Sequence, residues 1–253
     1  MKKNGKELYG LFLKSLLFIS ASLLLGCDDD DDLVIITYHY AQNDAEEALA
    51  ISLSYASYGF VANMSKASTE IQENYACDQW YYENESISEE TVSGHLSYEY
   101  SYEEEFRWSC DPIYEVDYNL MGMQHLSFGS NVKYLHDIGV DFQVTGLEEN
   151  SPYENYEGTY SRFGDWQSDY NGEGYYFTFR SEILEAKVSK SSNKITSGTV
   201  NFRLTQDYRH SQMSYTYEGT VEFINEDEAR VIYDSGEVFY IDLTHASISR
   251  LEF

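Results

Sequence analysis

The histidines, carboxylates and hydroxyls of this sequence are the side chains that could do catalytic or metal chemistry, but their spacing singles out no site. The 44 Asp and Glu residues make chance pairs inevitable, so no pair is assigned to acid–base catalysis. No GxSxG or P-loop pattern occurs. The histidines show no HxH or HExxH spacing, so no zinc centre is predicted, and we expect no metal, cofactor or catalytic residue. They are His39, His95, His125, His136, His210 and His245.

The segment from Asp169 to Gly174 resembles the start of an EF-hand calcium loop. Such a loop needs a bidentate Glu at its twelfth position, which here is Arg180. Asn171-Gly172 is also a strong signal for a two-residue β-hairpin turn. We therefore interpret the segment as a hairpin turn.

Tyrosine is unusually abundant, with 25 residues. On a strand, Tyr98, Tyr100 and Tyr102 would share one face. Because tyrosine has an apolar ring and a polar tip, such a face could bind sugars or peptides. The alternative is that these tyrosines fill a core or a half-exposed sheet face, as tyrosine commonly does in strands.

The N-terminal region has the pattern of an export signal. A basic start with Lys2, Lys3 and Lys6 precedes an apolar stretch that ends in Leu23-Leu24-Leu25-Gly26-Cys27. The uninterrupted apolar part is too short for a membrane span, which needs about 20 residues. The junction resembles the lipobox of bacterial lipoproteins. That resemblance implies cleavage before Cys27, lipid attachment to its sulfur and acylation of the new amino group. An ordinary secretory signal with a chance cysteine is the alternative.

Five aspartates follow Cys27: Asp28, Asp29, Asp30, Asp31 and Asp32. They resemble the acidic export signals of surface lipoproteins of Bacteroidota, which implies a lipid-anchored protein in the outer membrane, exposed at the cell surface. Aspartate directly after the cysteine marks inner-membrane retention in enterobacterial lipoproteins instead. Physically, the run is also a solvated, self-repelling tether.

The remaining cysteines, Cys77 and Cys110, are expected to form one disulfide, since an exported chain with one remaining pair most simply links it. Loss of residues 1–26 would remove four lysines and one glutamate, so the formal net charge would change from −28 to −31. Such a charge argues against binding nucleic acid or anionic lipid through a basic patch.

The hydrophobic pattern predicts an α+β protein, mainly β. Asp44 and the Ala-rich stretch after it favour a helix over 44–73, interrupted near Gly59. Residues 33–40 are predicted to be a strand or an extended lead-in, 78–93 a loop, and 121–138 an irregular crossover. Further strands are predicted at 95–102, 105–111, 113–120, 140–147, 156–163, 174–180, 183–189, 196–205, 214–224, 229–233 and 237–243.

These elements predict an N-terminal helical segment packed on a curled antiparallel meander sheet, a sandwich or a partial barrel. The expected domains are a signal peptide at 1–26, the lipidated cysteine and acidic tether at 27–33, and one folded domain at 34–253. The whole pattern resembles uncharacterised Bacteroidota surface lipoproteins.

We expect a non-enzymatic binding or structural protein of the cell envelope, held in the bilayer through acylated Cys27 and with an unknown glycan or protein partner. One alternative is a secreted hydrolase that acts on glycans. The other is a carrier of an apolar ligand in a β-barrel cavity.

Lipidation at Cys27 is directly testable. Cys27→Ala should leave the protein unprocessed or soluble, because the sulfur that takes the lipid is gone. Metabolic labelling with a fatty acid should mark the parent and not the variant. Persistent labelling of the variant would contradict the lipoprotein assignment.

Overall fold

The computed structural model describes residues 30–74, 76–90, 96–128, 132–168 and 172–250. The chain divides into two units, residues 1–40 and residues 41–253, and the sheet belongs entirely to the second. That unit begins at Ala41, whereas the sequence predicted a domain start at residue 34.

Within the described residues, two helices precede eleven strands. Helix α2 spans Asp30–Leu53 and α3 spans Phe60–Glu73. Each strand pairs antiparallel with its neighbours in sequence, so the sheet is one continuous meander that is not closed into a barrel. The predicted mainly β class with N-terminal helices is confirmed. The strands are β1 Trp80–Glu90, β2 Leu96–Ser109, β3 Glu115–Phe128, β4 Val132–Thr145, β5 Tyr153–Gln167, β6 Gly174–Ser189, β7 Lys194–Tyr208, β8 Ser214–Phe223, β9 Glu228–Tyr233, β10 Val238–Asp242 and β11 Ser247–Ser249.

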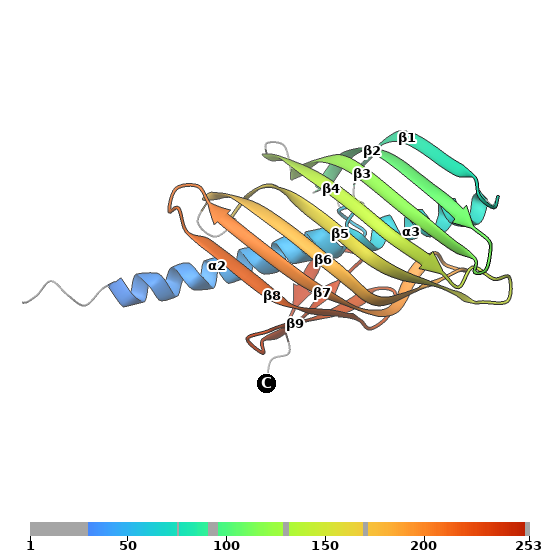
Figure 1. Ribbon diagram of the computed structural model, residues 1–253. Helices are drawn as coiled ribbons and strands as arrows, with labels where there is room; N and C mark the ends of the chain where they lie inside the picture. The colour runs from blue at the N-terminus through green and yellow to red at the C-terminus, as the bar shows by residue number, and fades with distance from the viewer. Residues whose placement is uncertain (1–29, 75, 91–95, 129–131, 169–171, 251–253) are drawn as a thin grey trace, which may run out of the picture. The chain divides into compact units, whose positions relative to one another are not determined.

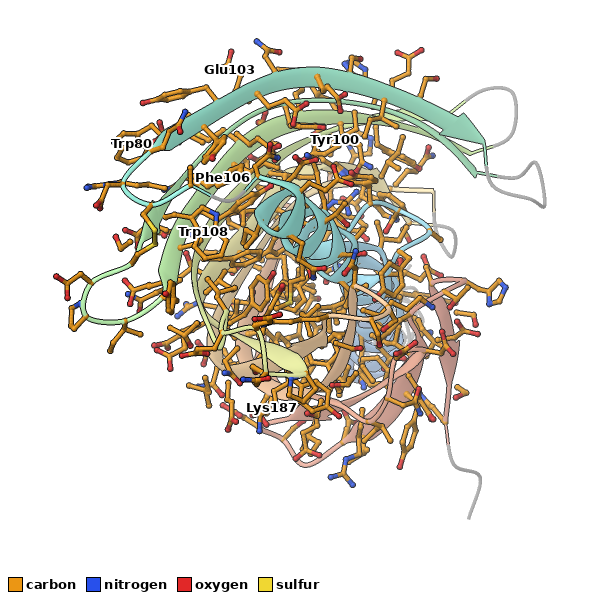
Figure 2. All side chains as sticks on the ribbon, turned by 90° about the vertical axis from the view of Figure 1, so that its right-hand side faces the viewer. Trp80, Tyr100, Glu103, Phe106, Trp108 and Lys187 are labelled. Atoms are coloured by element: carbon orange, nitrogen blue, oxygen red, sulfur yellow. A yellow bond between two sulfur atoms is a disulfide. The ribbon has the colours of Figure 1, made fainter. Side chains whose placement is uncertain are left out.

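The sheet curls around α3 and around the part of α2 that belongs to the second unit (Figures 1 and 2). Ala48, Leu49, Ala50 and Ile51 are all buried, although consecutive residues point in different directions around the helix. Small alanine side chains let the sheet approach α2 closely from several sides. Burial of each large apolar side chain contributes about 1.5–3 kcal/mol to stability.

The corner between the helices depends on Gly59. A Cβ atom there would lie 2.7 Å from the carbonyl oxygen of Ser52 and 2.8 Å from that of Ser54. Any other residue would therefore clash with the end of α2. The predicted interruption of the helix near Gly59 is confirmed.

The abundance of tyrosine is explained by the interior of the curled sheet. Large rings from the strands reach the helices, and their hydroxyl groups then meet polar atoms there. Tyr208 donates to Asp44 at 2.6 Å, and Tyr100 donates to Asn63 at 3.3 Å. In these contacts tyrosine fills a wide core and also donates to a buried polar side chain of α2 or α3.

A fully buried arginine on β5 holds the end of α2. Arg162 Nη1 donates to the carbonyl oxygen of Ile51 at 2.8 Å and to that of Ser57 at 3.4 Å. Its Nε donates to His136 Nδ1 at 3.1 Å, and its Nη2 donates to Gln124 Oε1. Gln124 Nε2 in turn donates to the Ser57 carbonyl oxygen at 2.7 Å. One side chain therefore ties three strands to the corner between the helices.

No carboxylate is among the hydrogen-bond partners that the structure gives Arg162. Its acceptors are neutral, and one of them is the Ile51 carbonyl group at the end of α2, where the helix dipole places partial negative charge. Burial lowers the pKa of Arg162. Burial and the neighbouring guanidinium also hold the pKa of His136 well below its usual value. His136 is therefore a neutral ring that accepts from Arg162 and donates through Nε2 to the Asp165 carbonyl oxygen at 3.0 Å.

Two predictions at the N-terminal end are wrong. Residues 33–40 are helical, not extended, and Asp30, Asp31 and Asp32 are also helical and not an extended tether. Helix growth is cooperative, so the Ala-rich segment extends upstream through residues of weaker helix propensity. Acidic residues are also favourable near a helix N-terminus. Asp28 and Asp29 lie outside the described residues.

Two further predictions are wrong on the sheet. The expected loop at 78–93 contains β1, and the described residues of the expected crossover at 121–138 belong to the end of β3 and the start of β4. Both segments are polar on at least one face, which masks the alternation that marks a half-buried strand. Pairing with long neighbours overrides weak local propensity.

Removing the buried guanidinium should destabilise the fold strongly. Arg162→Met leaves the Gln124 amide oxygen and His136 Nδ1 without their donor and removes one of the two donors to each of the Ile51 and Ser57 carbonyl oxygens. We expect a loss of at least about 3 kcal/mol in the free energy of unfolding. Arg203→Met is the matched control, because Arg203 is exposed and its pair with Glu218 at 3.0 Å should contribute less than about 1 kcal/mol. Urea denaturation measures both. Equal effects would contradict the role of Arg162.

The neutral state of His136 makes stability depend on pH. Above the unfolded pKa of about 6.5 neither state is protonated, and below it only the unfolded state takes up the proton. Stability should therefore fall as the pH drops below about 6.5, with a slope approaching about 1.4 kcal/mol per pH unit from this residue.

The variant His136→Gln isolates this effect. It should be less stable than the parent at pH 8, and the difference should shrink between pH 7 and pH 5. The buried carboxyls of Glu46 and Glu154 have raised pKa values and the opposite sign, but both proteins contain them, so they cancel in the comparison. A difference that stays constant with pH would refute the neutral, buried histidine.

Candidate ligand-binding face

The predicted aromatic face is not a surface. Tyr100 and Tyr102 are 0% and 2% exposed, and Figure 2 shows Tyr100 on the inner side of β2. Tyr102 donates to Glu85 at 2.5 Å, and Tyr100 packs against Tyr58 with ring centroids 4.7 Å apart. Tyr98 lies on β2, with its side chain outside the described part. Tyr100 and Tyr102 share one face, as the alternation indicated, and that face is the core, which was the alternative interpretation.

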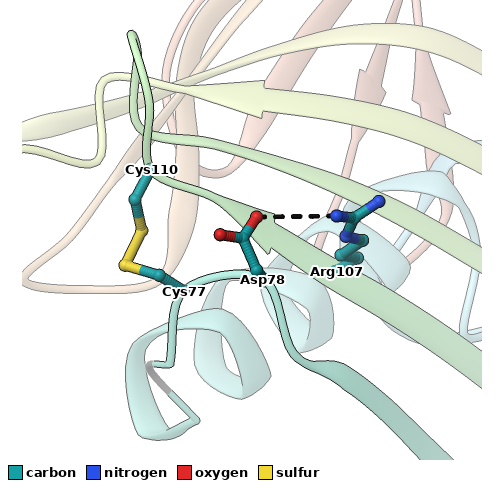
Figure 3. The surroundings of a disulfide bond; sticks show 4 residues. All are labelled: Cys77, Asp78, Arg107 and Cys110. Carbon is teal, nitrogen blue, oxygen red and sulfur yellow. Dashed lines mark hydrogen bonds and ion pairs between the residues drawn. A yellow bond between two sulfur atoms is a disulfide. The ribbon is translucent and has the colours of Figure 1, made fainter.

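The predicted disulfide is present. Cys77 and Cys110 are bonded, with Cα atoms 5.5 Å apart (Figure 3). Next to it, the Asp78 amide donates to the Trp108 carbonyl oxygen at 2.8 Å, and Arg107 pairs with Asp78 at 3.5 Å. Closure of a loop with a sequence separation of 33 residues stabilises a fold by about 3–4 kcal/mol on the chain-entropy model. The bond fixes the point at which the chain leaves α3 and enters β1.

The remaining predicted positions contribute no assembled site. Cys27 lies outside the described residues, as does His95. His136 is buried in the core, whereas His125, His210 and His245 are exposed. At the EF-hand-like segment, Gln167 pairs with Gly174 across the start of a hairpin, and Arg180 lies within β6. The interpretation as a hairpin turn is confirmed for the part that is described.

One carboxylate cluster joins α3 to the first two strands. Ligand oxygens of Glu70, Glu83 and Glu104 lie within 4.8 Å of one another. Lys66 Nζ lies 2.7 Å from Glu104, 3.4 Å from Glu70 and 3.9 Å from Glu83. A hydrogen bond with Glu104 raises the pKa of Glu83, with burial as a smaller cause. Because the Lys66 ammonium group already lies within ion-pair distance of all three carboxylates, we interpret the cluster as a structural ion-pair network.

Exposed aromatic side chains lie on the outer face of β1. Tyr82 is 72% exposed and Trp80 is 45% exposed, and their rings stack with centroids 6.2 Å apart at 22°. Tyr81 between them points inward and stacks on buried Phe106. Figure 2 shows Trp80 and Glu103 outside the sheet and Phe106 inside it. The two aromatic rings therefore form a platform at the edge of the sheet.

Polar side chains continue this face across the neighbouring strands. Tyr82 pairs with Glu105, which pairs with Asn119. In the next row, Asn84 pairs with Glu103, which pairs with Met121. Residues opposite each other on antiparallel strands lie side by side on the same face. We call this surface, made of Trp80, Tyr82, Asn84, Glu103, Glu105, Asn119 and Met121, the outer face.

The outer face is hollowed into a groove of about 480 Å³. Its lining includes the tyrosine, both glutamates, both asparagines and Met121, which is 73% exposed. At one end, the Arg107 guanidinium lies 5.8 Å from the centroid of the Trp80 ring. The groove thus combines an aromatic platform, carboxylate and amide acceptors, and an exposed apolar side chain, which is the usual composition of a binding surface for a polar ligand.

Sequence reasoning missed this face because it took residues 78–93 for a loop. The signal was the alternation Trp80-Tyr81-Tyr82-Glu83, in which Tyr81 and Glu83 belong to the inward row, and Trp80 and Tyr82 belong to the outer row. Without the register between β1 and β2, nothing in the sequence shows which of the two rows is buried.

Comparison with protein-family models, with curated proteins and with solved structures finds no match to this chain. Within the described residues, no helix is both long and apolar enough to cross a membrane. The outer face is therefore interpreted from the chemistry of its own residues.

Proposed function

We propose that this protein is a lipid-anchored protein of the bacterial cell envelope that binds a carbohydrate non-covalently on the outer face. The observation that carries the proposal is the stacked, exposed pair of Trp80 and Tyr82 beside a groove lined with carboxylates and amides. The anchor at Cys27 and the acidic run are supported by the sequence pattern alone. They would keep the folded unit at the membrane surface, where envelope and environmental glycans occur.

The chemistry of the groove fits a neutral or amine-bearing sugar. The apolar side of a sugar ring packs on an aromatic ring, and its hydroxyl groups donate to carboxylate and amide oxygens. Glu103 and Glu105 would repel acidic polysaccharides and phosphate groups at short range. An exposed, preformed sheet surface also loses little conformational freedom on binding.

The geometry favours binding over hydrolysis. Glycosidases use two carboxyl groups that flank the scissile bond, one as acid and the other as nucleophile or base. Glu103 and Glu105 are two residues apart on one strand, so they point to the same side of the sheet and lie beneath one side of a bound chain. This arrangement is suited to holding hydroxyl groups.

The interior of the sheet does not favour an apolar-ligand carrier. Side chains of α2 and α3, including Leu49, Phe60 and Met64, occupy the space inside the curl and are fully buried. Phe60 packs on Phe142, Tyr160 and Phe223. A ligand in that position would have to displace the protein's own core.

The helical state of Asp30, Asp31 and Asp32 changes the expected tether. A helical residue advances the chain by about 1.5 Å, against about 3.3–3.6 Å in an extended chain. The described part of the acidic run, from Asp30 to Asp32, thus gives a shorter and stiffer spacer than an extended chain would. Its proposed role as an export signal, shared with Asp28 and Asp29, depends on charge and not on length.

The binding proposal is tested on the full chain in neutral detergent with an array of neutral, amine-bearing and acidic glycans. We expect binding to neutral or amine-bearing glycans. Trp80→Ala and Tyr82→Ala should each weaken it about tenfold, because each removes about 1–2 kcal/mol of ring contact.

Tyr176→Ala is the matched control, since Tyr176 is an exposed strand tyrosine on β6, away from the groove. It should leave the affinity unchanged. Absence of any glycan ligand, or equal affinity in the parent and both groove variants, would overturn the proposal.

A further inference from the structure

The strands at the two edges of the sheet differ greatly in length. At one edge, β11 has three residues. At the other edge, β1 has eleven residues, and its pairing with β2 runs without a register shift from Trp80 to Glu90. In the described part of the chain, β2 is the one strand that pairs with β1, so the other side of β1 presents its backbone without a strand partner.

A long, regular edge strand usually carries protection against pairing with another chain. Common devices are shortness, a bulge, proline or charged side chains. β1 is long, and no proline or bulge interrupts it, so charge is the device that remains. Its charges all have one sign, because Glu83, Glu85, Glu89 and Glu90 are its charged residues.

The inner side of β1 is accessible at this edge. Glu83 and Glu85 belong to its inward row, yet Glu85 is exposed and Glu83 is 39% exposed at its side chain. A groove of about 360 Å³ lies close by, lined by Tyr55, Tyr58 and the α3 residues Ser65, Lys66, Thr69 and Glu70. Lys66 connects the two features, since it lines the groove and lies 3.9 Å from Glu83.

The acidic side chains of β1 favour a basic strand over a second copy of this chain as the binding partner at this edge. A second copy of the chain would bring the acidic row of its own β1 against the same row, and like charges on paired strands are destabilising. Lys66, the one basic residue that lines the groove, is already engaged by Glu104 at 2.7 Å. A strand that carries Lys or Arg at alternate positions would instead place its cations beside Glu83 and Glu85.

We infer that the edge of β1 binds an extended basic peptide segment as an additional antiparallel or parallel strand, with its inward side chains directed toward Glu83, Glu85 and the groove on α3. Backbone hydrogen bonds to β1 would supply affinity, and the alternate basic side chains would supply specificity. This site is separate from the outer face, and its test does not depend on carbohydrate binding.

The test uses the full chain in neutral detergent and fluorescently labelled peptides of about nine residues with alternating Lys and Thr. Fluorescence anisotropy should detect binding that weakens as salt increases, and a peptide with Glu in place of Lys should not bind. Two further peptides are N-methylated on alternate residues, one on the odd and one on the even positions. If the peptide adds as a strand, one set should abolish binding and the other should change it less than about threefold.

Glu83→Gln combined with Glu85→Gln should weaken binding of the basic peptide about three- to tenfold. The matched control combines Glu157→Gln with Glu182→Gln, which removes two exposed carboxylates from β5 and β6, and should leave the affinity unchanged. Thermal unfolding checks that both variants are folded, and the N-methylated peptides test the parent itself.

Three results would overturn the inference. The first is that both N-methylated peptides lose binding equally or keep it equally, and equal retention would mean that the interaction is only a general attraction between opposite charges. The second is that the acidic peptide binds as well as the basic one. The third is that the protein pairs with itself through β1.

Discussion

The buried guanidinium of Arg162 is the interaction on which the arrangement of helices and sheet depends. A buried charge is costly unless its surroundings replace water, and here the replacement comes from carbonyl groups of Ile51 and Ser57, an amide oxygen and a neutral imidazole. These acceptors belong to the helix corner and to two other strands. They meet only if the end of α2 lies against the inner side of the sheet, so the polar contact sets the position of the helices more specifically than apolar packing could.

The helices inside the curl determine where function can reside. Since side chains of α2 and α3 fill the inner side, binding surfaces must be on the outer side of the sheet or along its edges. The same filling explains why the sheet stays open. α3 occupies the inner side next to β1, held through Lys66, Glu70, Glu83 and Glu104, and β1 keeps a long accessible edge. The two proposed sites both follow from a sheet that wraps its own helices.

Much of the fold could be predicted from the sequence, because the later strands have clear alternation and good turns. The helical segment, the break at Gly59 and the link between Cys77 and Cys110 followed from residue types and their positions. Beyond these features, alternation with a period of two along a strand shows that the strand has two different faces, but it does not show which face is buried. For that reason the row with Tyr100 and Tyr102 could be interpreted either as a binding face or as part of the core, and the outer face of β1 was not recognised.

Arg162 is a second residue whose burial the sequence pattern does not reveal. It belongs to the inward row of β5 that includes Tyr160 and Trp166, so a lone basic residue in an aromatic row was the available signal. Its partners come from positions 38 and 111 residues away in sequence, such as Gln124 and Ile51. Only the folded chain shows that they converge.

Native-state hydrogen exchange of the full chain tests most directly whether α2 is a permanent part of the core. If it is, the amides of residues 45–53 should exchange only through global unfolding, with opening free energies within about 1 kcal/mol of those at the centres of β6 and β7. Exchange of these helix amides orders of magnitude faster than the strand centres would show that the interior opens independently. That result would contradict the claim that α2 is a permanent part of the core. The inside of the curled sheet would then again be a candidate ligand site.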